Sequence, residues 1–491
     1  MSSILIISVI VAYFLLLILI SYFTGKSDSN DSFFLGDKQS PWYVVAFGML
    51  GATLSGITFI SVPGKVDASA FSYMQMTLGF FFGYLIIALV LIPLYYRMNL
   101  TSIYGYLKER FGNSSYKTGA FFFLLSRVIG ASLRLYIVAN VLQMAIMDSW
   151  GVPYVVTVLI TILLIWVYTF RSGIKTIIWT DTLQTLFMLI AVGTSIYLIS
   201  DELNLGFSSL VTTISESDYS KVFFWEGDLH FFKQFFAGIF IAIVMTGLDQ
   251  DMMQKNLSCR TQQDAQKNLY WFSGALVLVN LIFLSLGALL YIYANEKGIT
   301  ATKDELFPAV ALNGGLGVGV GVVFILGLIA AAYSSADSAL TSLTTSFCVD
   351  ILGFEKEGDQ KKQIKTRKMI HLMFSFILLV VIMIIKVLND DSVIDSLFKL
   401  AGYTYGPLLG MYAFGMLTKL KLKDKFVPIV CLLSPFVAYY IAENSEVWFN
   451  YKFGFELLIL NGIITFAGLY LLKINKRFTL TTILPLKIYR K

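Results

Sequence analysis

The chain has 491 residues, of which 57% are apolar and only 14% are charged, and its mean hydropathy is +0.74. Soluble globular proteins carry roughly 25% charged residues, so this chain lacks the charge to cover a water-facing surface of its size. Its three cysteines form no spaced set, which excludes a disulfide framework and a zinc site, and its two histidines are too few for a proton relay. The net charge of +6 is divided among separate loops and therefore indicates no nucleic-acid partner.

Apolar runs of about 20 residues, the length that crosses ~30 Å of hydrocarbon, recur along the whole chain. They predict an all-α membrane protein that forms one transmembrane domain, residues 1–491, surrounded by lipid bilayer. The first run has neither a basic start nor a cleavage site, so it is expected to be a retained span. The thirteen predicted spans are residues 4–24, 42–63, 72–96, 117–147, 152–170, 177–200, 232–253, 268–294, 317–348, 369–389, 394–418, 426–443 and 453–473.

The basic residues of the loops predict the orientation. Loops that alternate to one side of the membrane, together with the C-terminal tail, carry 27 Lys and Arg residues, and the opposite loops carry seven. Because basic loops stay in the cytoplasm, the C-terminus is expected inside and the N-terminus outside a bacterial plasma (inner) membrane. The longest outward loop, residues 201–231, is expected to form a short surface helix.

The second predicted span is interrupted by glycine and hydroxyl side chains. It contains Gly48, Gly51 and Gly56 together with Thr53, Ser55 and Thr58. Glycine lowers helix propensity by about 1 kcal/mol, so this segment is expected to unwind. The alternative is that glycine merely permits close helix packing, which suffices as an explanation for Gly48 alone.

The seventh span is interrupted in a similar way, at Thr246, Gly247 and the run Asp249–Asp251. Spans two and seven lie five apart, an odd number, so two five-span units that begin with them would be inverted relative to each other. Paired broken segments in matching halves indicate a transport site near the middle of the membrane.

The ninth span holds the densest polar cluster of the chain. Ser334, Asp337 and Ser338 stand at i, i+3 and i+4 and therefore share one helical face, with Ser335 adjacent. A buried carboxylate costs at least ~2.5 kcal/mol and normally has a partner. Oxygen ligands of this kind suit sodium, and the alternative is an ion pair between Asp337 and a buried arginine.

Three further charged residues lie in apolar surroundings. Asp181 begins span six, where a carboxylate can simply cap a helix N-terminus. Arg127 and Arg134 are seven residues apart on one face of span four. Deep arginines pair with carboxylates, so each is a candidate to bind an anionic substrate or to form a structural pair with Asp337, Asp181 or Asp249.

The sequence contains no hydrolase, metalloprotease or nucleotide-binding motif, so an enzyme is not expected. It does resemble the sodium/solute symporter family, whose members include carriers for sugars, proline, pantothenate and sialic acid. The resemblance extends from the first span past span eleven and is carried by residues 52–65, 107–112, 177–184, 249–257 and 330–342.

The resemblance implies the LeuT-like fold, an inverted five-helix repeat formed by spans 2–6 and 7–11. Residues 42–200 would form repeat one and residues 232–418 repeat two. Residues 1–41 would add the first span and loop, and residues 419–491 two further spans and a basic tail.

The resemblance also implies one or two sodium ions as coupling ions. Sodium site one would use carbonyl and hydroxyl oxygens of Gly51, Leu54, Ala331, Ser334 and Ser335. In some members a second sodium lies between the ninth span and an aspartate of span six. Sodium site two would correspondingly use Asp181, Ser334, Asp337 and Ser338, although Asp337 stands where a serine is familiar in the family.

The substrate site implied by the resemblance lies at the broken second span, because TLSGIT resembles the TLSSIT of sialic-acid carriers. An arginine of span four holds the substrate carboxylate in those carriers, and both arginines fit that role. The candidate substrate-binding residues are Thr53, Ser55, Thr58, Tyr73, Gln75, Thr77, Arg127, Arg134 and Gln250.

The predicted function is therefore sodium-coupled symport of a small polar solute, such as sialic acid or another carboxylate or sugar-like solute, by alternating access. The alternatives are a proton-coupled symporter, with Asp337 or Asp181 titrating, and a non-transporting membrane sensor. No obligate protein partner is indicated by the sequence.

Overall fold

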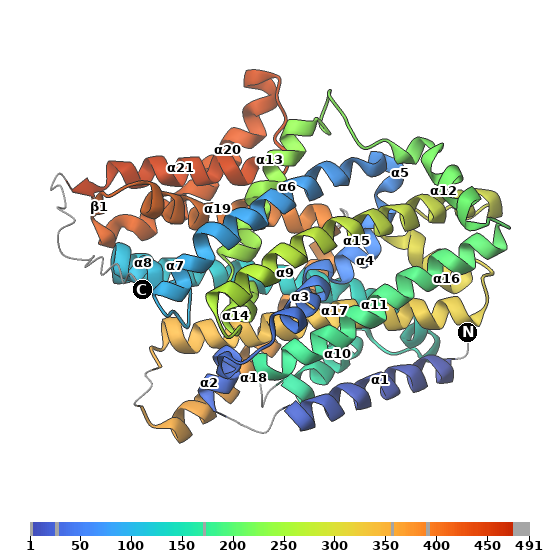
Figure 1. Ribbon diagram of the computed structural model, residues 1–491, viewed down its shortest axis with the longest axis horizontal. Coiled ribbons are helices and arrows are strands. Elements are labelled where there is room, and N and C mark those ends of the chain that lie inside the picture. Colours follow the sequence, from blue (N-terminus) through green and yellow to red (C-terminus); the bar gives the residue numbers. More distant parts are fainter. Residues whose placement is uncertain (1–2, 25–28, 170–172, 355–357, 389–392, 475–491) are drawn as a thin grey trace, which may run out of the picture.

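The structure is a computed structural model that describes residues 3–24, 29–169, 173–354, 358–388 and 393–474. The helices lie side by side along the long axis of the molecule, and the described chain begins at one end of this bundle and ends at the other (Figure 1). Residue 170, residue 389 and part of the basic tail, residues 475–491, belong to predicted segments but lie outside the described residues.

The described residues of the first half of the chain, through the long loop, form twelve α-helices. They are α1 (Ser3–Thr24), α2 (Asn30–Leu35), α3 (Trp42–Leu54), α4 (Gly56–Gly64), α5 (Val66–Ser69), α6 (Tyr73–Ile86), α7 (Ile92–Arg97), α8 (Gly105–Arg110), α9 (Asn113–Leu142), α10 (Tyr154–Thr169), α11 (Ile174–Glu202) and α12 (Phe207–Ser215).

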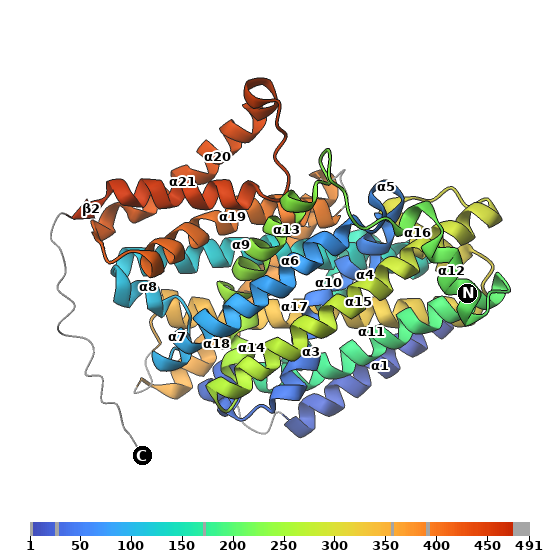
Figure 2. The same cartoon turned by 45° about the horizontal axis from the view of Figure 1, so that its top comes forward.

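The second half contains the remaining helices and two short strands. The helices are α13 (Phe231–Ala242), α14 (Gln250–Leu257), α15 (Gln262–Lys297), α16 (Leu306–Asn313), α17 (Val318–Ser346), α18 (Gln360–Leu388), α19 (Val393–Leu417), α20 (Val427–Phe449) and α21 (Leu457–Leu471). Strands β1 (Lys421–Leu422) and β2 (Lys473–Ile474) pair antiparallel, and α20 and α21 pack on α19 at the edge of the bundle (Figure 2).

Every predicted span overlaps a helix or a pair of helices, and α12 supplies the helix expected in the long loop. Within the described residues, eight helices are long and apolar enough to cross a membrane, or ten segments if each bent pair is one span. Helices α10 and α21 contain shorter apolar segments, and α19 lies beside α21. The total of thirteen spans remains a prediction.

The outer surface of the bundle is apolar. Large side chains on different helices are more than half exposed, for example Leu15, Leu163, Leu278 and Phe436. An aqueous solvent would oppose this exposure, whereas the hydrocarbon of a bilayer matches it. Helix α17 lies inside this shell, and its residues 327–346 are all buried although many are polar.

Both predicted interruptions are present as bends. The axis turns by 53° between α3 and α4 and by 64° between the helix at Phe231–Gly247 and α14. The first bend is at Ser55, whose φ of 22° is incompatible with a regular helix. The expectation that the glycines unwind this segment is therefore wrong for Gly48 and Gly51, which lie within α3.

These two glycines instead allow α3 to approach α11. A Cβ on Gly51 would lie 2.1 Å from the hydroxyl of Thr185, and a Cβ on Gly48 would lie 3.1 Å from the Cβ of Asp181. The close approach brings Asp181 against the middle of α3, and Thr185 against Gly51, one turn before its end. Glycine here sets the distance between helices, and the packing interpretation is correct.

Candidate functional site

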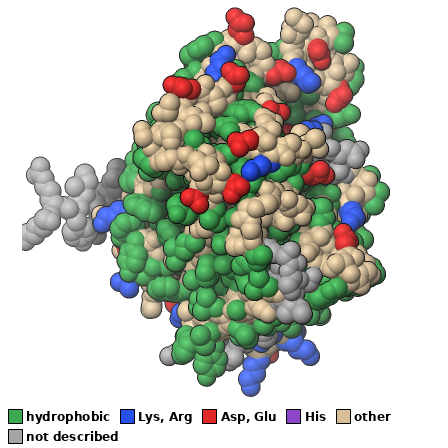
Figure 3. Space-filling model, turned by 90° about the vertical axis from the view of Figure 1, so that its right-hand side faces the viewer, with side chains coloured by type: hydrophobic (Ala, Val, Ile, Leu, Met, Phe, Trp, Pro, Cys, Tyr) green, Lys and Arg blue, Asp and Glu red, His purple; other side chains and the backbone are tan. Residues whose placement is uncertain are grey.

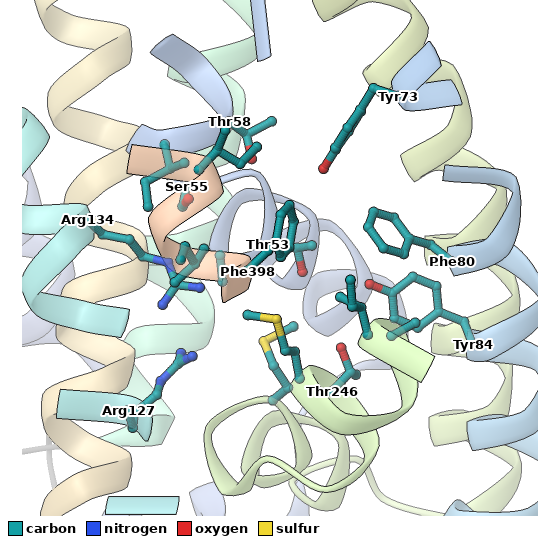
Figure 4. A pocket seen from close by; sticks show the side chains of 18 residues that line it. Thr53, Ser55, Thr58, Tyr73, Phe80, Tyr84, Arg127, Arg134, Thr246 and Phe398 are labelled. Atoms are coloured by element: carbon teal, nitrogen blue, oxygen red, sulfur yellow. The ribbon is translucent and has the colours of Figure 1, made fainter. Parts of the chain in front are cut away.

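A cavity of about 80 Å³ lies beside the bend between α3 and α4 and is called the central cavity here (Figure 4). Its walls are supplied by the bend itself, α6, α9, the segment preceding α14, α14 and α19. Its lining residues are Ala52, Thr53, Ser55, Ile57, Thr58, Tyr73, Phe80, Tyr84, Arg127, Arg134, Ile241, Ala242, Met245, Thr246, Met252, Ile394, Leu397 and Phe398.

The two sides of the central cavity differ in chemistry. Arg134 and Arg127 extend from one side, while Tyr73, Tyr84 and Thr246 turn their hydroxyl groups inward from the other (Figure 4). Thr53 lies between the two sides, and its hydroxyl oxygen is buried without a hydrogen-bond partner among the described residues. This arrangement can receive an anionic group at one end of a ligand and hydroxyl groups along the rest.

The two arginines have different surroundings. Arg127 forms an ion pair with Asp251, and its Nη1 lies 3.8 Å from Asp249. Asp249 caps α14 by accepting from the backbone N–H of Asp251 at 2.9 Å, and it also accepts a short hydrogen bond from Tyr405. Arg127 therefore has the structural pairing that the sequence left open as an alternative.

Arg134 has no such partner in the part of the chain that the structure describes. Its Nε and Nη1 atoms are buried without a hydrogen-bond acceptor, and the residue is 6% exposed. A buried guanidinium that lacks its hydrogen bonds is unstable by several kcal/mol, on the order of the cost of any uncompensated buried charge. It can be compensated by an anionic ligand in the cavity.

Three candidate substrate residues lie away from the central cavity. Gln75 holds the loop before α13, since its Nε2 donates to the carbonyl of Leu229 at 2.9 Å and its Oε1 accepts from Phe224. The hydroxyl of Thr77 donates to the carbonyl of Tyr73 one turn back. Gln250 holds the turn before α8 through Ile103 and Thr101, at 2.9 Å each.

The central cavity is lined instead by several residues that were not among the candidates predicted from the sequence. Phe80 and Tyr84 lie seven and eleven residues after Tyr73, so helical periodicity alone could have identified them as neighbours on α6. Thr246 stood out as an interruption of span seven without a role. Ile394, Leu397 and Phe398 of α19 line the cavity, but as ordinary apolar residues they carry no signal in the sequence.

The serines of α17 contact the broken second span and α11. Ser335 donates from its Oγ to the carbonyl of Ala52 at 2.8 Å, next to the bend. Ser334 donates to Oδ1 of Asp181 at 2.8 Å, and Ser338 lies 3.5 Å from Oδ2 of the same carboxylate. Asp337 accepts from the backbone N–H of Ser338, within its own helix.

Sodium site one is consistent with this geometry. Leu54 ends α3, Gly51 lies one turn earlier, and Ala331 lies one turn before Ser335 on the facing stretch of α17. Carbonyl and hydroxyl oxygens are the ligands that a hard cation prefers. These residues would hold sodium at the contact between α17 and the bend.

One buried cation was not anticipated. Lys255, expected in a cytoplasmic loop, lies within α14 at 1% exposure, with its Nζ 2.6 Å from Oδ2 of Asp181. Asp181 lies seven residues after the start of α11, so the expectation that it merely caps a helix N-terminus is wrong.

A further ion pair, between Lys65 and Asp395, lies next to the cavity wall formed by α19. Lys65, between α4 and α5, lies 2.5 Å from Asp395 near the start of α19. Asp304, between α15 and α16, accepts from the backbone N–H of Val393 at 3.1 Å. These contacts hold α19 over the central cavity, where its apolar side chains form one wall.

Comparison with known proteins agrees with this geometry. Residues 33–419 match the family model described as "Sodium:solute symporter family". The sodium/sialic acid symporters NanT of Aliivibrio fischeri and SiaT of Proteus mirabilis are each 25% identical to this chain. Both alignments cover 81% of this chain, and they cover 80% of NanT and 81% of SiaT.

Solved structures show the fold. A Na⁺-coupled sialic acid symporter, in a substrate-bound outward-open state, superimposes with a TM-score of 0.81 at 20% identity, covering 95% of this chain and 97% of that one. The nucleobase-cation-symport transporter Mhp1 superimposes with a TM-score of 0.53 at 13% identity, covering 90% and 93%. The fold is the LeuT-like fold that the family resemblance implied, and it forms a multi-pass inner membrane transporter. From the family match over most of its length, this chain belongs to the sodium:solute symporter family and couples the transport of a small solute to sodium.

Proposed function

We propose that the transported solute carries a carboxylate and several hydroxyl groups, as sialic acid does. The observation that carries this proposal is the uncompensated guanidinium of Arg134 in the wall of the central cavity. A carboxylate accepts two parallel hydrogen bonds from such a group, and this pairing is strong when it is buried.

The opposite wall supports the same class of solute. The hydroxyl groups of Thr53, Tyr84 and Thr246 are placed to donate to, or accept from, the hydroxyls of a polyol chain or sugar ring. Phe80 and Phe398 offer apolar faces between them. The first solute to test is sialic acid, which the relatives NanT and SiaT carry according to their names.

Sodium at site one couples to the solute through the bend. The same segment, residues 51–58, supplies carbonyls to site one and side chains to the central cavity. A ligand that stabilises one conformation of this segment raises the affinity of the other ligand, and the effect is reciprocal. An inward membrane potential adds ~2.3 kcal/mol per sodium per 100 mV to the driving force.

The central cavity must enlarge to receive the solute. Its volume of about 80 Å³ is far below the roughly 300 Å³ at which pockets for small organic ligands begin. Helix α19 contributes the wall that can move, since the Lys65–Asp395 pair that fixes its first turn is partly exposed. Opening this pair would give the solute a path from the end of the bundle where α12 lies.

We propose that this end faces the outside, with the N-terminus outside and the C-terminus in the cytoplasm. Acidic side chains gather over the upper half of this end, between hydrophobic patches (Figure 3). The positive-inside rule counts Lys and Arg and gives acidic residues little weight. It favours this end as the outer one because the loops assigned to it carry seven basic residues, against 27 on the other side. Residues 42–200 and 232–418 are correspondingly proposed as the two inverted repeats.

The test is a thermal-shift titration of the purified protein with sialic acid and with its methyl ester, each in sodium and in potassium. In sodium the acid should raise the melting temperature and the uncharged ester should not. The Arg134→Met variant should bind the acid about 30-fold more weakly or worse, because one partner of a buried charge pair is lost.

Thr77→Val is the matched control, because Thr77 lies on α6 next to the lining residues but bonds only within its own helix. It should bind like the unaltered protein. Equal binding of acid and ester would contradict the role of Arg134, and equal stabilisation in potassium would contradict sodium coupling. Binding of neither compound would exclude sialic acid as the solute.

A further inference from the structure

The carboxylate expected to form part of sodium site two is paired with a cation that the protein itself provides. Asp181 is fully buried, and its Oδ2 lies 2.6 Å from the ammonium of Lys255. The same carboxylate accepts from Ser334 and Ser338. Three of the four residues of this expected site are therefore already joined through one carboxylate, whose charge the ammonium neutralises.

The ammonium is held in place by the packing of α14. Residues 250–257 are all buried. The turn that carries Lys255 is fixed by Gln254, whose Nε2 donates to the carbonyl of Phe34 at 2.7 Å and to the hydroxyl of Thr345 at 3.1 Å. Removing the ammonium from Asp181 would leave two buried charges without partners, which is strongly unfavourable.

A sodium ion cannot share this carboxylate at low cost. Two unit charges about 4 Å apart in a buried setting repel strongly enough to weaken binding on the order of a hundred- to a thousandfold. Sodium site one differs, because its expected ligands are the carbonyl and hydroxyl oxygens of Gly51, Leu54, Ala331, Ser334 and Ser335. The oxygens of site one suit an added cation, and the carboxylate of site two is already neutralised.

We propose that Lys255 acts as a tethered cation that takes the place of a second sodium, so that this carrier binds a single sodium, at site one. This inference rests on the proposed sodium coupling and sharpens its stoichiometry. Ser334 then serves Asp181 through its hydroxyl, and the ion pair joins α11, α14 and α17 permanently. In a carrier with two sodium ions the second ion would make this connection only when bound.

The experiment counts sodium ions directly. Equilibrium binding of ²²Na⁺ to the purified full-length protein should saturate at one ion per chain. The Lys255→Met variant, which keeps the length of the side chain and removes its charge, should saturate at two. The double variant Lys255→Met with Asp181→Asn should return to one, because the added sodium then lacks its carboxylate.

Saturation of the unaltered protein at two ions would overturn the inference, and so would one ion in a folded Lys255→Met variant. If Lys255→Met does not fold, the unaltered protein and Lys255→Arg decide: one ion in both supports the tethered cation, and two ions in either contradicts it. The thermal-shift titration with the solute is independent of the number of sodium ions bound. If sodium coupling fails, that titration shows equal stabilisation by the solute in sodium and in potassium.

Discussion

Arg127 and Arg134 leave the same face of α9, yet only one of them is neutralised by the protein. The neutralising carboxylates, Asp249 and Asp251, belong to the bend before α14. The segment from Asp249 to Asp251 reaches the turn of α9 that carries Arg127 but not the turn that carries Arg134, which leaves Arg134 facing the central cavity. A difference of two turns along one helix thus separates an arginine in a structural ion pair from the one proposed to bind the solute.

The sequence could place both arginines on one face but could not choose between them. Their spacing of seven residues is a local property. The partners of Arg127 lie more than a hundred residues later, and their position depends on the geometry of a bend that no periodicity predicts. The same reason explains why Lys255 was missed, since only the fold brings α14 against Asp181.

At this scale we predict that Arg127→Met destabilises the protein by about 3–5 kcal/mol. The change leaves Asp249 and Asp251 buried without their guanidinium. Thermal or denaturant unfolding in detergent measures the effect. The sodium dependence of stability should persist, because Arg127 does not contact the α17 serines.

The double variant Arg127→Met with Asp251→Asn is the matched control, since it removes the ion-pair partner as well. It should recover part of the lost stability. If Arg127→Met unfolds like the unaltered protein but loses solute binding, Arg127 and not Arg134 is the substrate arginine.

At the scale of helices, the bend in span two and its close packing against a neighbouring helix are produced by different residues. Ser55 makes the bend between α3 and α4, and Gly51 sets the approach of α3 to α11. Composition predicted that span two is abnormal and that span seven matches it. It could not predict which residue bends, because the bend is stabilised by contacts such as that between Ser335 and the carbonyl of Ala52.

We predict that Gly51→Ala destabilises the protein by about 1–3 kcal/mol, the usual effect of overfilling a packed interface. The added methyl group would meet the hydroxyl of Thr185 at 2.1 Å. Combining the change with Thr185→Ala should restore part of the stability. Thermal unfolding of the purified variants measures both effects.

Gly193→Ala is the matched control on the partner helix. Nothing lies within 4 Å of a Cβ at this position, which is exposed on α11. It should leave stability unchanged or raise it slightly, because alanine has the higher helix propensity. Equal effects of the two substitutions would show that α3 and α11 do not pack as closely as described.

For the whole molecule, hydropathy located the spans and charge predicted their orientation. The segments were predictable because each crosses a bilayer of fixed thickness, so length and apolarity are constrained independently of the fold. Lys255 was counted among the 27 inward loop residues and is buried instead. The excess of Lys and Arg in the inward loops remains almost unchanged without it. The arrangement of the helices around the site depends on contacts between distant segments and required the structure.

The orientation can be tested with single cysteines, because the native Cys259, Cys348 and Cys431 are all buried and should not react. Ser208 on α12 and Gln263 at the start of α15 are exposed and lie at opposite ends of the bundle.

With α12 outside, Ser208→Cys should be labelled on intact cells by a membrane-impermeant maleimide. Gln263→Cys should be labelled only after the membrane is opened, since it follows the inward end of span seven. The reverse pattern would invert the proposed orientation, and labelling of both on intact cells would contradict the alternation of spans between them, on which the inverted repeat depends.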